Sequence, residues 1–402
     1  MNLSRIFLVL AATLAACAAA HSAIAHEGHG EHGRSMGGGA GKEAAEQNAS
    51  AAFDARGVLW AVHGDSGRIA VSRSEDLGRS WRKPVRVTAA IEATDSGGDA
   101  RPKIAVGAGG ELYVTWTRPL ARPYTGEIRF SRSVDGGASF SAPLVVHADR
   151  QQITHRFDSI AVNAKGQVFV AWIDKRDQER LGANAKTYRG AAVYWAVSDD
   201  RGASFRGDFK LADYSCECCR IALLPREDGG VYAFWRHVFE PNIRDHALGE
   251  ITARGAAGKV VRATFDDWRV DACPHHGASL AQDAGGQLHA VWFTGAPGKS
   301  GVYYGRLREG AVDGQRRVGG QTAEHADLSA IGNKLAIAWK EFDGERSRLR
   351  AARSDDAGRT WRESELAATD SPSGQPFVLA HDGTFYVFWN RRDAPLSVVT
   401  LP

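Results

Sequence analysis

Short apolar strands joined by glycine-containing turns recur along this chain and dominate its hydrophobic pattern. In each copy a strand is followed by a turn and a second strand that usually ends in tryptophan; the six closing residues are Trp116, Trp172, Trp235, Trp292, Trp339 and Trp389. A seventh copy, AAFDARGVLWAVH, places His63 at that position. Helical periodicity is absent, so we predict an all-β chain with the closing tryptophans in its core.

The copies recur at intervals of roughly 45 to 65 residues, which suits a four-stranded propeller blade. We therefore predict a β-propeller of four-stranded antiparallel blades over residues 51–402. Seven hairpins favour seven blades, and six blades are the alternative. The last copy ends after a third strand, so we expect either a strand lent by the N-terminal segment or an incomplete last blade.

A second pattern falls between the hairpins and has the form Ser-x-Asp-x-Gly-x-Ser/Thr-aromatic. It occurs as SEDLGRSW, SVDGGASF, SDDRGASF and SDDAGRTW, beginning at Ser74, Ser133, Ser198 and Ser354. We expect each to form a turn in which the Asp carboxylate accepts backbone N–H groups, glycine takes a positive φ and the aromatic side chain packs beneath.

These turns resemble the Asp-boxes of the sialidase-like (BNR-repeat) β-propeller family, and the resemblance covers about residues 51–402. It implies a sialidase-like fold in which these turns lie opposite the active site. Six blades are usual in sialidases. A shared fold does not transfer the activity, which depends on site residues.

The N-terminal segment predicts export. An apolar run follows Arg5 and ends in small residues at Ala25, typical of a signal peptide over residues 1–25. Alternatively, Leu14 to Cys17 resembles a lipobox that would anchor the protein by lipid at Cys17. Residues 26–50, rich in His and Gly, are predicted to be a disordered linker or a weak metal tether. We expect a periplasmic or outer-membrane lipid-anchored protein.

One face of the predicted propeller collects cationic and histidine side chains. Just before the first strands of the hairpins stand Arg101, His155, Arg156, Cys216 to Arg220, Cys273 to His276, His325 and Gln375. Just after the second strands stand Arg118, Asp174 to Arg176, Arg236, His237, Lys340, Glu341 and Asn390 to Arg392. We predict a small anionic ligand or a metal ion there, bound in the first case by Arg101, Arg156, Arg220, Arg236 and Arg391. A net charge of +3, without a basic run interleaved with aromatics, argues against nucleic acid.

The stretch YSCECCR, residues 214–220, holds three of the five cysteines. Two disulfides with Cys273 would suit an oxidising compartment, but pairing neighbours such as Cys218 and Cys219 closes strained rings. The other hypothesis is a copper or zinc site, because thiolates and imidazoles bind these soft and borderline ions. Its predicted ligands are Cys216, Cys218, Cys219, Cys273, His275 and His276.

The resemblance also suggests the hypothesis of sialidase activity. That activity implies an arginine clamp, a Tyr–Glu nucleophile and an Asp acid. The nearest match to the family's first arginine motif, around Arg220, has cysteine for the aromatic and alanine for the proline. Asp158 or Asp174 is the candidate acid, but no Tyr–Glu pair stands out.

Three hypotheses remain: a metal-binding or anion-binding propeller, a glycoside hydrolase acting on sialic or related acidic sugars, and a non-enzymatic protein scaffold. The oligomeric state is not determined by these patterns.

Overall fold

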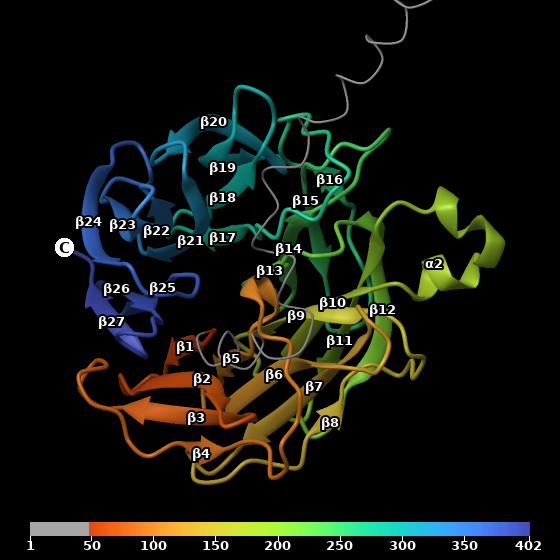
Figure 1. Cartoon of the computed structure of the whole chain (residues 1–402), viewed down its shortest axis with the longest axis horizontal. Helices are drawn as coiled ribbons and strands as arrows, with labels where there is room; N and C mark the ends of the chain where they lie inside the picture. Colours follow the sequence, from red (N-terminus) through yellow and green to blue (C-terminus); the bar gives the residue numbers. More distant parts are fainter. Residues whose placement is uncertain (1–47) are drawn as a thin grey trace, which may run out of the picture. The chain divides into compact units, whose positions relative to one another are not determined.

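Seven antiparallel sheets succeed one another along the chain in a computed structural model that describes residues 48–402 (Figure 1). Each sheet is built from strands consecutive in sequence; the first six have four strands and the last has three. The prediction of a seven-bladed, all-β propeller is therefore confirmed, and the six-bladed alternative is wrong.

The blades are numbered here in chain order. Blades 1 to 3 comprise β1 (Ser50–Phe53), β2 (Leu59–Asp65), β3 (Arg68–Ser74), β4 (Val85–Arg86), β5 (Lys103–Val106), β6 (Leu112–Pro119), β7 (Gly126–Ser133), β8 (Leu144–Val145), β9 (His155–Val162), β10 (Val168–Asp174), β11 (Ala191–Ser198) and β12 (Arg206–Ser215). Blades 4 and 5 comprise β13 (Ala222–Pro225), β14 (Val231–Arg236), β15 (His246–Ile251), β16 (Val261–Arg262), β17 (Ser279–Gln282), β18 (Leu288–Thr294), β19 (Gly301–Arg308) and β20 (Ala311–Val318). Blades 6 and 7 comprise β21 (Ala323–Ile331), β22 (Lys334–Phe342), β23 (Ser347–Ser354), β24 (Arg362–Thr369), β25 (Phe377–His381), β26 (Thr384–Trp389) and β27 (Ser397–Thr400).

The first strands of the blades form the inner ring of the propeller. β1 contacts β5, β5 contacts β9, and the succession continues through β13, β17, β21 and β25 back to β1. Because β1 is the inner strand of its own blade, no N-terminal strand within residues 48–402 completes blade 7. Of the two closures expected, residues 48–402 have the incomplete last blade.

Tryptophan side chains fill the spaces between blades, as predicted from the hairpin pattern. The six closing tryptophans are at most 1% exposed. They lie in the second half of the second strand of each hairpin, where side chains alternate between the two faces of the blade and can pack on the neighbouring blade. His63, in the seventh copy, is only half-buried and bonds Ser72 through Nε2 at 2.9 Å.

The four Ser-x-Asp-x-Gly turns follow the third strands of blades 1, 2, 3 and 6 and have the expected internal hydrogen bonds. In blade 2, Asp135 accepts from the Ser139 backbone N–H at 3.0 Å and from the Ser133 hydroxyl at 2.7 Å. The fifth-position glycines have φ of 77 to 84°, and their N–H groups donate to the first serine. The aromatic residues are partly buried; Phe205, for instance, packs edge-on against Phe130 of blade 2.

The connections carry little helix: a short helix α2 (Arg176–Arg180) and the 3-10 turns η1 (Gly98–Ala100) and η2 (Gly182–Thr187). Within residues 48–402 no helix is of a length and apolarity that would let it cross a membrane. The predicted signal peptide, the lipobox at Cys17 and nearly all of the linker over 26–50 lie outside the described residues.

Candidate metal centre

The three clustered cysteines lie in the loop that leads from β12 of blade 3 to β13 of blade 4. Cys216, Cys218 and Cys219 are 1%, 3% and 2% exposed. They belong to an apolar cluster that includes Phe157 and Ile221. The loop is bound to the end of β14, because the Cys216 N–H donates to the Arg236 carbonyl at 2.9 Å. The cysteines are therefore held in the water-poor interior between two blades.

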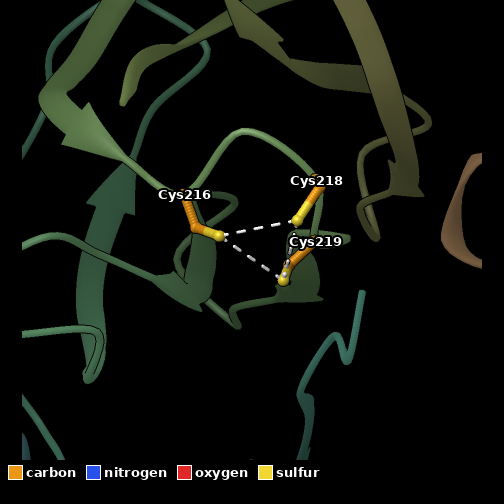
Figure 2. A group of neighbouring side chains, drawn as sticks. All are labelled: Cys216, Cys218 and Cys219. Carbon is orange, nitrogen blue, oxygen red and sulfur yellow. Dashed lines mark hydrogen bonds between the residues drawn. The ribbon is translucent and has the colours of Figure 1, made fainter. Parts of the chain in front are cut away.

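The three sulfur atoms point toward one another (Figure 2). Cys216 Sγ lies 3.7 Å from both Cys218 Sγ and Cys219 Sγ, and those two are 4.0 Å apart. The point equidistant from all three lies about 2.2 Å from each sulfur, close to the ~2.3 Å of a zinc–thiolate bond. The triangle is therefore the right size to hold one metal ion of that radius.

Electrostatics assign the negative charge of this group to Cys216. The thiols of Cys218 and Cys219 donate to its sulfur, and the positive charges of Arg236 and Arg244 add to them, so the pKa of Cys216 is lowered well below its usual value. Arg244 Nη1 is 3.5 Å from the Cys216 sulfur. The pKa values of Cys218 and Cys219 are raised, first of all because their protons are held by the Cys216 thiolate.

Cys273 approaches the group from the next loop, between β16 of blade 4 and β17 of blade 5. It is exposed, and its thiol interacts with that of Cys218. None of the four cysteines within residues 48–402 forms a disulfide in this structure. Cys273 lies outside the sulfur triangle, so its role as a ligand stays a prediction.

Within residues 48–402, the candidate metal-holding group at the cysteines contains Cys216, Cys218 and Cys219 and neither of the two predicted histidines. His275 is exposed, and His276 stacks on Phe293 at 4.0 Å and groups with Glu324 and His325, whose candidate ligand atoms lie within 4.8 Å of one another. Gln375 Nε2 donates to His325 Nδ1 at 2.9 Å, because the Gln375 carbonyl oxygen already accepts from Arg101. Neutral His325 therefore carries its proton on Nε2, 3.7 Å from Glu324. His276, Glu324 and His325 thus form a second group whose ligand atoms are close enough to hold a metal ion.

The five predicted ligand arginines lie around the same face and bond protein groups, although the Nε atoms of Arg101, Arg236 and Arg391 have no hydrogen-bond partner within the described residues. Arg220 donates to the carbonyls of Ala278 and Ala326, and so joins blade 4 to blades 5 and 6. Arg236 donates to the carbonyls of Arg244, His276 and Phe293.

The remaining three are likewise engaged. Arg156 pairs with Asp95, and Arg391 lies 3.6 Å from Asp393. Arg101 is buried over the Phe377 ring and bonds Gln375, and burial lowers its pKa to about 9. An anion would have to compete with these partners, so the arginine clamp stays a prediction.

The candidate sialidase acids are also engaged. Asp174 is fully buried and accepts from Trp172 Nε1 at 2.8 Å and from Arg176 at 2.7 Å. Asp158 is fully buried, accepts from Thr117 at 3.1 Å and lies 3.8 Å from Lys103. A proton donor must be accessible to the sugar, and both carboxylates are buried.

Two residues of the metal centre were missed by the sequence analysis. Arg244 precedes the third strand of blade 4, and third strands begin on the same face as first strands; extending the search to these positions would have found it. Asp99 lies in η1 and accepts from the backbone N–H groups of Arg220, at 3.3 Å, and Gly277, at 2.8 Å. A Cβ at Gly277 would collide with Arg220 and Asp99, so glycine permits this close approach.

A separate groove of about 600 Å³ lies between blades 4 and 5, lined among others by Tyr232, Glu250, Lys259, Gln287 and Arg308. It includes the β17–β18 and β19–β20 turns, which lie on the face opposite the cysteines. The groove therefore does not contribute to the metal centre.

Comparison with known proteins supports the fold and leaves the family open. No protein-family model and no curated protein matches the sequence. By structure, the chain is similar to an ulvan lyase of a polysaccharide lyase family, with TM-score 0.54 and 10% identity over 87% of this chain and 90% of the lyase. It is also similar to the α-L-arabinofuranosidase of Fusarium graminearum, with TM-score 0.53 and 12% identity over 77% of this chain and 96% of the enzyme. The NanB sialidase of Streptococcus pneumoniae matches at TM-score 0.47 and 10% identity, over 74% of this chain and 65% of its own, too weakly to support an argument. At these identities the likeness extends to the propeller fold alone.

Proposed function

We propose that this protein is an exported propeller of the sialidase-like family that binds one soft metal ion, copper(I), through Cys216, Cys218 and Cys219. The observation that carries the proposal is the triangle of three buried sulfur atoms, 3.7, 3.7 and 4.0 Å apart. The predicted signal peptide supports export, and the four Ser-x-Asp-x-Gly turns support the family.

The donor set favours copper(I) over zinc. Thiolate is the soft ligand that selects copper(I), whereas structural zinc sites are tetrahedral and need a fourth ligand. Three thiolates around a monovalent ion carry a net charge of −2, and the buried guanidinium groups of Arg236 and Arg244 lie next to them. The paired positive charges offset the cost of burying that anionic complex.

The test is metal analysis of the mature protein, purified anaerobically from the periplasm without a His-tag, together with an anaerobic copper(I) titration. We expect about one equivalent of tightly held copper(I), by the one-site geometry and the thiolate preference for this ion. Cys218→Ala and Cys219→Ala should each abolish tight binding. Alanine keeps the buried site apolar, and circular dichroism checks that the variants are folded.

An Ala272→Ser variant serves as the control, since it changes the adjoining loop and removes no sulfur. Retention of copper(I) by both alanine variants would refute the three-sulfur site. One equivalent of zinc with no copper(I) uptake would replace copper by zinc in the proposal. No metal with no free thiols would favour the disulfide hypothesis.

The glycoside hydrolase and scaffold hypotheses remain predictions. The first would require a sialic acid reporter to be cleaved, with loss of activity on changing Arg156 or Arg236. The second would require a partner protein whose binding is insensitive to changes in the cysteines.

A further inference from the structure

The sulfur triangle is closed to direct contact with a metal carrier. Its three cysteines are 3% exposed or less and are packed among apolar side chains. Copper(I) moves between sulfur ligands by association, in which the incoming sulfur bonds the ion before the outgoing one leaves. An ion can therefore reach the triangle only through a ligand that is itself accessible.

Cys273 has the two properties that such a ligand needs. It is exposed, so a carrier can present an ion to it. Its loop is also anchored to the loop of the triangle, and Cys218 lowers the pKa of the Cys273 thiol, although the two residues belong to loops that lead into different blades.

Two side chains fix the Cys273 loop to the loop that holds the triangle. Arg244 donates through Nε to the Val270 carbonyl at 3.1 Å, while its Nη1 lies 3.5 Å from Cys216 Sγ. On the other side of Cys273, Asp99 accepts from the backbone N–H groups of both Gly277 and Arg220. Cys273 is thus held beside the triangle from both ends of its own loop.

We propose that Cys273 is the exchange ligand through which copper(I) enters and leaves the site, an inference that rests on the proposed function. The donor is a copper(I) complex of a thiol or thioether. A Cys273 sulfur–copper bond forms as the carrier's sulfur–copper bond breaks, and the Cys273 proton passes to the leaving thiolate, or to solvent where the carrier ligand is a thioether. The ion then bonds the Cys216 thiolate, Cys218 and Cys219. The protons of Cys218 and Cys219 are released, one of them to Cys273 as its bond to copper breaks and the other to solvent. Copper remains in the +1 state throughout.

The test compares the mature wild-type protein with Cys273→Ser in anaerobic stopped-flow experiments. Copper(I)–glutathione is the donor, and bathocuproine disulfonate is the acceptor that reports release by its colour. For Cys273→Ser we expect uptake and release of copper(I) to slow at least about tenfold. A tenfold slowing corresponds to ~1.4 kcal/mol in the activation free energy of exchange. We expect the equilibrium affinity to stay within about threefold, because the three resident sulfur atoms are retained.

The outcomes separate this inference from the proposed function. Unchanged rates in Cys273→Ser would overturn it, as would a loss of affinity as large as that of Cys218→Ala, which would make Cys273 a resident ligand. Ala272→Ser should exchange copper at the wild-type rate; slowing there equal to that of Cys273→Ser would assign the effect to the loop and overturn the role of the thiol. Absence of copper(I) uptake by the wild-type protein would refute the proposed site itself. That result would be seen before any variant is compared.

Discussion

Arg244 shows how one side chain can set both the charge and the shape of the candidate centre. It is 8% exposed and joins the Cys216 sulfur to the backbone of the neighbouring loop. Arginine suits this position because its planar guanidinium stays charged when buried and offers several donors in fixed directions. Its positive charge lies where a copper(I)–thiolate complex would be most negative.

Replacing Arg244 by glutamine should therefore weaken copper(I) binding. A hydrogen bond to a charged group contributes ~1.5–3 kcal/mol, which corresponds to a loss of roughly tenfold to a hundredfold in affinity. Competition against a chromophoric copper(I) chelator measures it. Zinc affinity should fall less, since a zinc complex of three thiolates carries one negative charge fewer. Arg308→Gln, at an exposed position of β19, is the control. Equal affinities in all three proteins would rule out a role for the Arg244 charge.

The elements most fully specified by local sequence are the Ser-x-Asp-x-Gly turns. In the blade 2 turn, Asp135 accepts hydrogen bonds from Ser139 and Ser133, which lower its pKa from 3.8 to about 2. All of these partners lie within four residues of the carboxylate. For this reason the sequence alone was enough to predict the turn and its hydrogen bonds.

The same turn gives a pH dependence with a defined sign. The Asp135 pKa is depressed in the folded protein, so its stabilising effect is complete above about pH 3.8 and is lost as the pH falls toward 2. Asp135→Asn should lower the Tm at neutral pH. The difference in Tm between the variant and the wild type should narrow between about pH 4 and 2, as measured by thermal unfolding followed by circular dichroism. Glu227→Gln, at an exposed position, should show no such gap. A gap for Asp135→Asn that is constant with pH would contradict the assignment.

On the scale of the whole molecule, the ring closes by side-chain packing between blades 7 and 1. Phe388 of β26 is fully buried in a cluster with Ala49, Ala51, Leu59 and Ala61 of the N-terminal region. Among the residues that the structure describes, no strand is exchanged between the two blades, and blade 7 has one strand fewer than the others. Within residues 48–402, blades 7 and 1 therefore meet at a seam joined by side-chain packing and not by strand pairing.

We expect this seam to be the first part of the propeller to open. Phe388→Ala should cost about 3–5 kcal/mol of unfolding free energy, as for other large-to-small core changes, and should raise hydrogen exchange in β1 and β25 to β27. Phe234→Ala changes the matching residue of blade 4, also fully buried, and should leave exchange at the seam unchanged. Mass spectrometry of deuterium uptake distinguishes the two variants; the same exchange pattern in both would mean that the ring has no weakest seam.

Much of the fold and part of the candidate centre followed from the sequence, because they depend on contacts between near neighbours in the chain. The hairpins, the buried tryptophans and the turns each form within a short segment whose hydrophobic period and glycines are visible directly. The grouping of Cys216, Cys218 and Cys219 is of the same kind, since a single loop contains all three.

Tertiary structure decided what surrounds those cysteines. Only tertiary packing brings Arg244 of blade 4 to the Cys216 sulfur in the loop between blades 3 and 4. It also sets the Cys273 loop beside the loop of the other cysteines and places His276 with Glu324 and His325 of blade 6. It also engages the predicted arginine clamp in bonds between blades. These contacts join segments far apart in sequence, and their distances depend on how many blades close the ring and how each loop leaves its strand. The order of residues in the chain therefore specifies which groups this face carries, and closure of the ring specifies which of them meet.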